Sequence, residues 1–218
     1  TELDEGALGA MVPTLQAEGV EAIAIGFLHS YVNAAHEQRA RDVLAAHMPD
    51  VAITISGDVS PEIREYDRFS TACANAYVQP LMAGYLGRLS AAVKGQGFRG
   101  ALLLMMSGGG LTTLETAQRL PIRLVESGPA GGAILASHIA RENGLDEVLS
   151  FDMGGTTAKI CLIADGEPER ARVFEVARAY RNLKGSGWPV RIPVIEMVEI
   201  GAGGGSIASV DIGGLLSV

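Results

Sequence analysis

Apolar positions in the first quarter of the chain follow two alternating patterns. Residues 4–17 carry them at helical spacing, and so do residues 34–47, which predicts two helices. The apolar runs at 21–28 and 51–55 predict strands, and the first run has so few polar residues that we expect burial on both faces. Short links between strand, helix and strand are typical of a parallel sheet.

A long helical pattern covers residues 66–94, with Pro80 inside it. A proline in a helix removes a hydrogen bond and crowds the preceding turn, so we expect a kink or a break there. The run ALLLMM at 101–106 predicts a third, central strand, and residues 112–119 predict a short helix. IRLVE at 122–126 predicts a fourth strand.

The last third of the chain has a different character from about residue 147 onward. A helix is expected from Ser127 to about Glu142, followed by a strand at 147–153. The run AKICLI, which begins at Ala158, is expected to pair back across that strand and to end in a turn at 164–166. The remainder is glycine-rich and mainly β, so the fold class is α/β, with mixed sheets flanked by helices.

Composition excludes some classes of protein. With 17 basic and 25 acidic residues the net charge is -8, which argues against a nucleic acid as the main partner, since that would need a clustered basic face. No apolar run reaches the length of a membrane span. Cys73 and Cys161 are too few for a disulfide framework, so both are expected to be buried thiols. We therefore expect a cytoplasmic protein without a nucleic-acid or membrane partner.

The ends of the chain favour a piece of a longer polypeptide. The sequence starts at Thr1 without a methionine, and it stops at Val218 shortly after the pair Gly213 and Gly214. We expect the remaining lobes of that polypeptide to be partners of this chain.

The stretch FDMGGTTAKI at 151–160 carries the strongest candidate chemistry. Gly154 and Gly155 let backbone N–H groups approach an anion, and Thr156 and Thr157 add hydroxyl donors. Asp152, at the end of a strand, is placed to orient water on Mg²⁺. The same ten residues also fit a plain β-hairpin with an acid at its neck.

Other glycine-rich loops follow predicted strands. Ser107, Gly108 and Gly109 come after ALLLMM, and Ser127 and Gly128 come after IRLVE. Ligand loops gather at strand ends in open α/β sheets, so two such loops on adjacent strands favour one shared ligand surface.

A third glycine-rich turn, at 201–205, contains Gly201, Gly203 and Gly204. With Ser206 it fits a loose dinucleotide-binding pattern, but that pattern needs a helix directly after the glycines, and SIASVDI alternates like a strand. We therefore expect a turn that faces the nucleotide, or a structural hairpin.

Two further clusters are open to a functional and a structural interpretation. His29, His36 and Glu37 lie between a predicted strand and helix, where a metal or substrate could bind, although capping and packing is the favoured interpretation. The charged stretch EIREYDRFST at 62–71 fits a solvated turn with weak ion pairs, or a substrate or interlobe contact.

Several stretches, in order along nearly the whole chain, resemble the hydantoinase A/5-oxoprolinase family, which includes subunits of acetone-type carboxylases. That family is similar in turn to the actin, sugar-kinase and heat-shock-chaperone ATPases. The matching stretches are LHSYVNAAHEQRA, PEIREYDRFST, NAYVQP, SGGGL, ESGPAGGA, FDMGGTTAK and IGAGGGSIA.

The resemblance implies an actin-like fold and ATP-dependent work on cyclic amides. The expected reaction opens a hydantoin, N-methylhydantoin or 5-oxoproline ring through phosphoryl activation, with ATP and Mg²⁺ as cofactors. Alternatives are a subunit of an ATP-dependent ketone carboxylase, an actin-fold small-molecule kinase, and a non-catalytic nucleotide-binding scaffold subunit. A second subunit or fused enzyme half is expected as a partner.

By the family pattern, residues 1–146 are the later part of a first lobe and residues 147–218 are the start of a second lobe. The hairpin 151–160 is then one phosphate hairpin of a two-lobed cleft, with Asp152 as its catalytic and metal-binding acid. Many relatives carry an acid where this chain has Lys159. This replacement has three interpretations: metal binding depends more on Asp152, Lys159 contacts a phosphate, or Lys159 faces solvent.

Overall fold

A computed structural model describes residues 2–180, 183 and 185–217. Thr1 and Val218, on which the expectation of a longer polypeptide rests, lie outside the described residues, as do 181, 182 and 184. The chain divides into two compact units. Unit 1 comprises 1–104, 111–125 and 172–193, and unit 2 comprises 105–110, 126–171 and 194–218.

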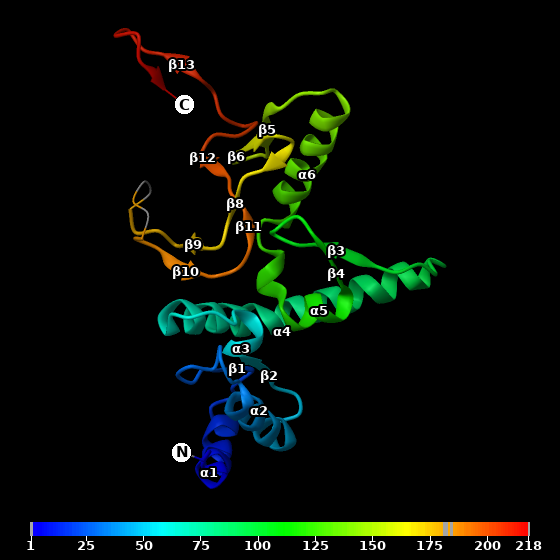
Figure 1. Cartoon of the computed structure of the whole chain (residues 1–218), viewed down its shortest axis with the longest axis vertical. Coiled ribbons are helices and arrows are strands. Elements are labelled where there is room, and N and C mark those ends of the chain that lie inside the picture. Colours follow the sequence, from blue (N-terminus) through cyan, green and yellow to red (C-terminus); the bar gives the residue numbers. More distant parts are fainter. Residues whose placement is uncertain (1, 181–182, 184, 218) are drawn as a thin grey trace. The chain divides into compact units, whose positions relative to one another are not determined.

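Unit 1 begins with the predicted strand–helix–strand arrangement (Figure 1). Helix α1 (Glu5–Ala17) precedes β1 (Ala22–Ile25), α2 (Ala35–His47) and β2 (Ala52–Ile55). The two strands are parallel, in register from Ala22 opposite Ala52 to Ile25 opposite Ile55, as predicted. The buried core between the elements is made of Val12, Ile25, Ala40, Leu44, Met48 and Ile55. Ala24 is exposed, so the prediction that this strand is buried on both faces is wrong.

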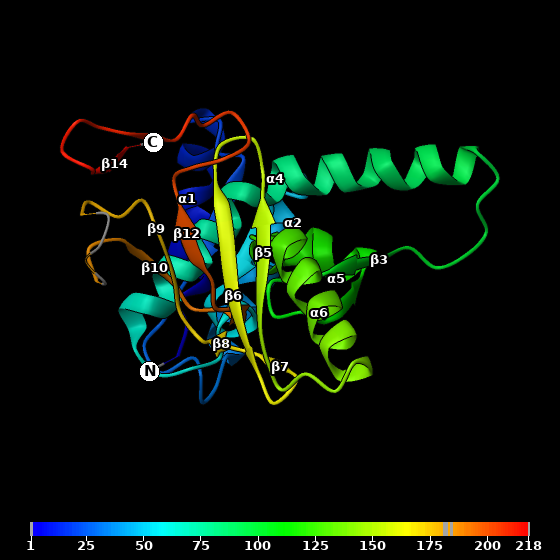
Figure 2. The same cartoon turned by 90° about the horizontal axis from the view of Figure 1, so that it is seen from above.

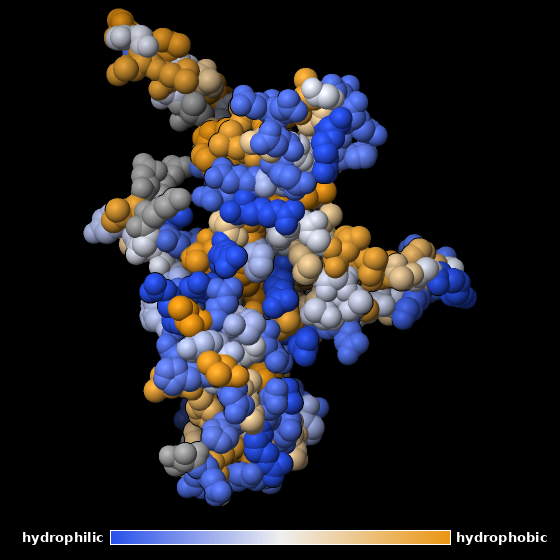
Figure 3. Space-filling view, in the orientation of Figure 1, coloured by the Kyte–Doolittle hydropathy of each residue, from blue (hydrophilic) through white to orange (hydrophobic). Residues whose placement is uncertain are grey.

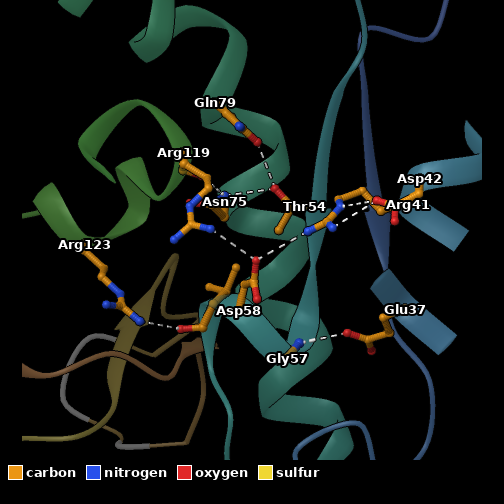
Figure 4. Close-up of polar contacts among 11 residues, drawn as sticks. Glu37, Arg41, Asp42, Thr54, Gly57, Asp58, Asn75, Gln79, Arg119 and Arg123 are labelled. Carbon is orange, nitrogen blue, oxygen red and sulfur yellow. Dashed lines mark hydrogen bonds and ion pairs between the residues drawn. The ribbon is translucent and has the colours of Figure 1, made fainter. Parts of the chain in front are cut away.

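The short helix α3 (Ser56–Val59) leads to α4 (Glu65–Gly95), a single helix of 31 residues. The helix continues through Pro80 without a break. Asn75, buried on α4, donates hydrogen bonds to Thr54 Oγ1 (2.9 Å) and to the carbonyl of Arg119 (3.1 Å). Thr54 in turn donates to Gln79, and Figure 4 shows these polar groups together. Because these buried polar groups form their hydrogen bonds with each other inside the protein, they fix α4 to β2.

The predicted third and fourth strands differ from the structure. Only Leu103–Met105 of the first apolar run forms a strand (β3), and it pairs with β4 (Leu111–Thr113) in a two-stranded hairpin. It is therefore no central strand. After α5 (Leu114–Arg119), the segment Pro121–Leu124 is a 3₁₀ helix, η1, whose first residue is the proline. A short apolar run fits a buried helical turn as well as a strand, and the proline at its start favours the turn.

Unit 2 is built on helix α6 (Ser127–Glu142) and the antiparallel strands β5 (Glu147–Met153) and β6 (Ala158–Ala164). The strand β12 (Val198–Ile200) pairs with the other edge of β6, and Figure 2 shows the three strands side by side with α6 along them. Cys161 of β6, Ile195, and two alanines of α6, Ala130 and Ala133, form the core between helix and sheet. These elements agree with the sequence prediction.

Short strands complete both units. Within unit 1, β9 (Phe174–Val176) pairs with β10 (Trp188–Val190). Within unit 2, β7 (Glu167–Pro168) follows the predicted turn and pairs with β6, β8 (Arg170–Ala171) pairs with β11 (Val194–Ile195), and β13 (Ser209–Val210) pairs with β14 (Leu216–Ser217).

The last hairpin carries exposed apolar side chains, which Figure 3 shows as an orange segment. No helix among the described residues is long and apolar enough to span a membrane. Of the two free thiols, Cys161 is buried as predicted, whereas Cys73 is exposed on α4, so the prediction of a buried Cys73 is wrong.

Candidate functional site

The predicted phosphate hairpin is a tight, exposed connection between β5 and β6. The N–H of Gly154 donates to the carbonyl of Thr157 at 2.9 Å, which closes the turn. Residues 152–156 are exposed and Thr157 is half-buried. In the part of the chain that the structure describes, no group accepts a hydrogen bond from the N–H of Gly155 or Thr156. These two backbone donors are therefore available to an anion.

A second glycine loop packs directly on this hairpin. The N–H groups of Gly204 and Gly205 donate to the carbonyls of Gly154 (2.9 Å) and Gly155 (3.5 Å). A Cβ atom on Gly203 would lie 2.5 Å from the backbone carbon and oxygen of Gly155 and 2.6 Å from the nitrogen of Thr156. Real Cβ atoms do not approach backbone so closely, so only glycine fits at 203.

The structure thus brings two predicted motifs, 154–157 and 203–205, into one backbone-lined surface. Gly201 lies in an exposed bend between β12 and this loop. Residues 204 and 205 form a turn and residues 206–208 belong to no helix or strand, in agreement with the rejection of a dinucleotide-binding pattern. A surface of glycine backbone suits an anion such as phosphate, because its N–H groups act as donors without a side chain in the way.

Asp152 and Lys159 lie opposite one another on β5 and β6. The Asp152 carboxylate is exposed and, among the described residues, takes part in no hydrogen bond or ion pair. Lys159 has only 16% of its side chain exposed, and its ammonium pairs closely with Glu126 and lies 3.9 Å from Glu199. The prediction of a lysine facing solvent is therefore wrong: the side chain is held between two acids.

Ser127 and Gly128 begin helix α6. They follow Glu126, which has left-handed backbone angles (φ 60°, ψ 20°) and provides no side-chain cap. Space around Gly128 is open, since a Cβ atom at this position would meet no atom within 4 Å. The uncapped start of a helix concentrates backbone donors and partial positive charge, which favours a nearby anion.

The loop Ser107–Gly109 lies elsewhere in unit 2. Ser107 is buried and its carbonyl accepts from the N–H of Ile195 at 2.9 Å. A Cβ on Gly109, which has φ 83°, would lie 2.7 Å from the side chain of Ile134 on α6. The expected pair of loops on adjacent strand ends, which includes Gly108, is wrong, because Pro121–Leu124 ahead of Ser127 forms a 3₁₀ helix and no strand.

The histidine cluster does not form a metal site. Among the described residues, no three His, Cys, Asp or Glu side chains gather as a metal site would require. Glu37 is fully buried, and its carboxylate accepts from the N–H of Phe27 (2.8 Å), from Ser56 Oγ (2.6 Å) and from the N–H of Gly57 (2.8 Å). It joins the ends of β1 and β2, in agreement with the structural interpretation.

The charged stretch 62–71 hides a buried cation that the sequence pattern does not reveal. Arg68 is fully buried and donates to Ser56 Oγ (3.0 Å) and to the carbonyls of Glu62 (3.1 Å) and Phe27 (2.8 Å). The interpretation as a wholly solvated turn is therefore wrong. Its carboxylate partner is Glu65, at 3.6 Å, three residues earlier in the same stretch. Such a local pair is equally typical of an exposed arginine, so the charge pattern does not separate Arg68 from its exposed neighbours.

Another arginine, Arg191, fixes the same stretch from far along the chain. Its guanidinium pairs with Glu62 at 2.6 Å and with Asp67 at 3.1 Å, and these acids raise its pKa. The N–H of Arg191 also donates to Thr71 Oγ1 at 2.7 Å. The stretch is thus a structural junction within unit 1.

Comparison with known proteins gives consistent matches over the whole chain. The hydantoinase/oxoprolinase family matches residues 68–218, and the N-terminal region of the same family matches residues 1–48. The chain is 39% identical over its full length to an uncharacterized protein of Methanocaldococcus jannaschii, and 35% identical over 99% of its length to the caprolactamase subunit alpha of Pseudomonas jessenii. It spans 32% and 30% of those two relatives.

Two solved structures share its fold. The crystal structure of the ATP-dependent caprolactamase from Pseudomonas jessenii is similar with a TM-score of 0.79 and 33% identity, over 97% of this chain and 29% of that one. A nucleotide-free acetone carboxylase structure is similar with a TM-score of 0.75 and 26% identity, over 98% of this chain and 29% of that one. The predicted mixed α/β fold class is confirmed.

Proposed function

Because this chain belongs to the hydantoinase/oxoprolinase family, we propose that it is part of an ATP-dependent cyclic-amide hydrolase and supplies one phosphate-binding wall of its nucleotide site. The observation that carries this proposal is the packing of Gly203 on the backbone of Gly155 and Thr156. That contact joins two glycine loops into a surface of backbone donors next to the Asp152 carboxylate.

In this proposal the chain's own groups position ATP. The free N–H groups of Gly155 and Thr156 and the hydroxyls of Thr156 and Thr157 bind phosphate oxygens. The start of α6 at Ser127 adds the positive end of a helix dipole to the same end of the sheet, since α6 and β5 are antiparallel neighbours joined by a short link. Phosphoryl transfer depends mainly on such positioning and charge neutralisation.

Phosphoryl activation suits a cyclic amide. When the amide oxygen accepts the γ-phosphoryl group, ADP leaves and the ring carbon becomes more electrophilic. One water adds to this carbon, and the C–N bond then breaks, which releases the ring nitrogen as an amine and leaves an acyl phosphate. A second water hydrolyses the acyl phosphate to a carboxylate and inorganic phosphate. The relative whose structure is similar is described as an ATP-dependent caprolactamase, and a caprolactam ring is a cyclic amide. Hydantoin, N-methylhydantoin and 5-oxoproline rings are the other candidates.

Asp152 fits a magnesium ion that is held mainly by phosphate. Mg²⁺ keeps several waters and uses one or two carboxylates together with substrate phosphates, so a single exposed acid beside a phosphate loop is sufficient. Asp152 would hold the ion or one of its waters, and the ion would neutralise charge on the transferred phosphoryl group.

The proposal is tested on the full-length protein by ATP turnover with and without a cyclic amide. Asp152→Asn should lower turnover about 100-fold or more while the melting temperature stays unchanged, because the side chain is exposed. Asp165→Asn is the matched control: Asp165 is exposed at the opposite end of β6, in a left-handed turn (φ 52°) that asparagine also adopts. Equal turnover by Asp152→Asn and wild type would refute the site.

A ketone carboxylase subunit is the second candidate, and the similarity to acetone carboxylase favours it. The two reactions differ in what ATP turnover requires. A hydrolase should turn over ATP with a cyclic amide alone, whereas a carboxylase should need a ketone and bicarbonate together. Further lobes and a second subunit are proposed partners, since this chain spans only about a third of its relatives.

A further inference from the structure

One lysine in unit 2 has three carboxylates around it. The register of the sheet places Asp152 of β5 and Glu199 of β12 directly opposite Lys159 of β6, one on each side. Glu126, just before α6, pairs with the same ammonium group. The described residues include two lysines, Lys159 and Lys94, and Lys94 is exposed on α4.

These side chains lie on the face of the sheet that α6 covers. Directly paired residues on antiparallel strands point to the same face, and residues two apart on a strand share it. Cys161 lies two residues after Lys159 and packs against Ala130 and Ala133 of α6. The row Asp152, Lys159 and Glu199 therefore faces the helix, at the end of the sheet that carries the glycine loops.

The three acids are not equivalent. Lys159 pairs with Glu126 and lies 3.9 Å from Glu199, but no ion pair joins it to Asp152. Glu126 holds left-handed backbone angles, which are unfavourable for a residue with a side chain and persist only where other contacts fix them. The ion pair to Lys159 is such a contact.

We propose that Lys159 is a positioning residue of the phosphate site. Its ion pair with Glu126 ties the first turn of α6 to β6, the strand that follows the glycine hairpin. Asp152, the acid of the row that is not paired with Lys159, then faces the nucleotide's cation. This rests on the proposed function. Without the lysine, Glu126 and Glu199 are unneutralised acids beside bound phosphate, and the start of α6 loses its link to β6. Both effects weaken nucleotide binding more than they slow the chemical step.

The experiment compares Lys159→Gln, Lys159→Arg and Glu126→Gln in the full-length protein, with Lys94→Gln as the matched control. Calorimetric titration gives the Kd for Mg-ATP, and steady-state turnover gives KM and kcat. Hydrogen exchange without nucleotide reports on the amide of Ala130, which donates to the carbonyl of Glu126 at 3.1 Å. Lys159→Gln should raise the Kd and KM at least about tenfold, with a smaller change in kcat and faster exchange at that amide.

Three comparisons decide the outcome. Lys159→Arg keeps the charge and should restore most of the affinity, whereas Lys94→Gln should match wild type. In the double variant Glu126→Gln/Lys159→Gln, the loss should be smaller than the product of the single losses, because the repulsive acid is gone. An unchanged Kd in Lys159→Gln would overturn the proposal, whether or not exchange becomes faster. If wild type itself neither binds nor turns over ATP, the proposed function fails, while faster exchange in Lys159→Gln would still support the link to α6.

Discussion

Replacing Gly203 with alanine tests the contact on which the candidate site depends. The new Cβ would lie 2.5–2.6 Å from three backbone atoms of Gly155 and Thr156. An ordinary contact needs about 3.4 Å or more, so one loop has to move by about 1 Å. Because the obstructing atoms are backbone, no side-chain rotation relieves the clash, and overpacking of this kind costs about 1–3 kcal/mol.

The cost should appear where the two loops are hydrogen-bonded. The N–H groups of Gly204 and Gly205 donate to the carbonyls of Gly154 and Gly155, so separation of the loops exposes them to solvent. A local loss of about 1–3 kcal/mol corresponds to exchange about 5- to 150-fold faster at these amides. Hydrogen exchange of the full-length protein, resolved over residues 198–208, measures this directly.

Gly204→Ala is the matched control for Gly203→Ala. Its Cβ would meet only the carbonyl oxygen of Gly154, at 3.8 Å, and its φ is not positive. Exchange should therefore stay near the wild-type rate in Gly204→Ala. Equal exchange rates in wild type and Gly203→Ala, or equal acceleration by both substitutions, would refute the reasoning that glycine is required at 203 for packing. ATP affinity should fall in Gly203→Ala together with the exchange protection.

Two further predictions concern buried polar groups. Arg68→Met should destabilise the protein by about 3–5 kcal/mol in urea unfolding, because it removes a buried cation and leaves two backbone carbonyls without donors. The control, Arg88→Met, should change stability little, since Arg88 is exposed. Equal unfolding midpoints for Arg68→Met and wild type would contradict the buried network. Burial raises the pKa of Cys161, so iodoacetamide at pH 8 should label exposed Cys73 much faster, as peptide mapping would show. Similar labelling of both thiols would contradict the burial. The pKa of Cys161 is higher in the folded than in the unfolded chain, so its contribution to stability is fully present below the unfolded thiol pKa and is lost as the pH rises from there through the folded pKa.

The periodic segments were predictable because their patterns are long. The helices at 5–17, 35–47, 65–95 and 127–142 and the parallel pair β1–β2 agree with the apolar spacing. The β5–β6 hairpin was predictable from two apolar runs separated by a glycine pair. In each case the signal extends over several turns or alternates with clear turn residues, so local pattern and tertiary packing favour the same structure.

Short apolar runs and charged clusters were not predictable for a physical reason. A short apolar run such as IRLV is compatible with a strand and with a buried helical turn, and tertiary packing decides which of them forms. Arg68 belongs to a stretch that fits a solvated turn, and a solvent-facing side chain was one of three interpretations of Lys159. The structure instead gives Arg68 a partner at Phe27 in addition to its local ones, and gives Lys159 a partner at Glu126. Sequence pattern reports a residue's polarity, but it does not report which distant groups will satisfy it.

The glycine loops show where local reasoning about the candidate surface was incomplete. Glycine was expected at 154 and 155 because it turns freely, but neither residue has positive φ. A Cβ on Gly155 would meet no atom within 4 Å, so neither backbone angle nor space requires glycine at that position. At Gly203 the requirement is the approach of another backbone, which no single loop reveals. A net charge of -8 is compatible with a phosphate site of this kind, because its donors are backbone groups and its nearby acids are either paired with Lys159 or, like Asp152, suited to a cation.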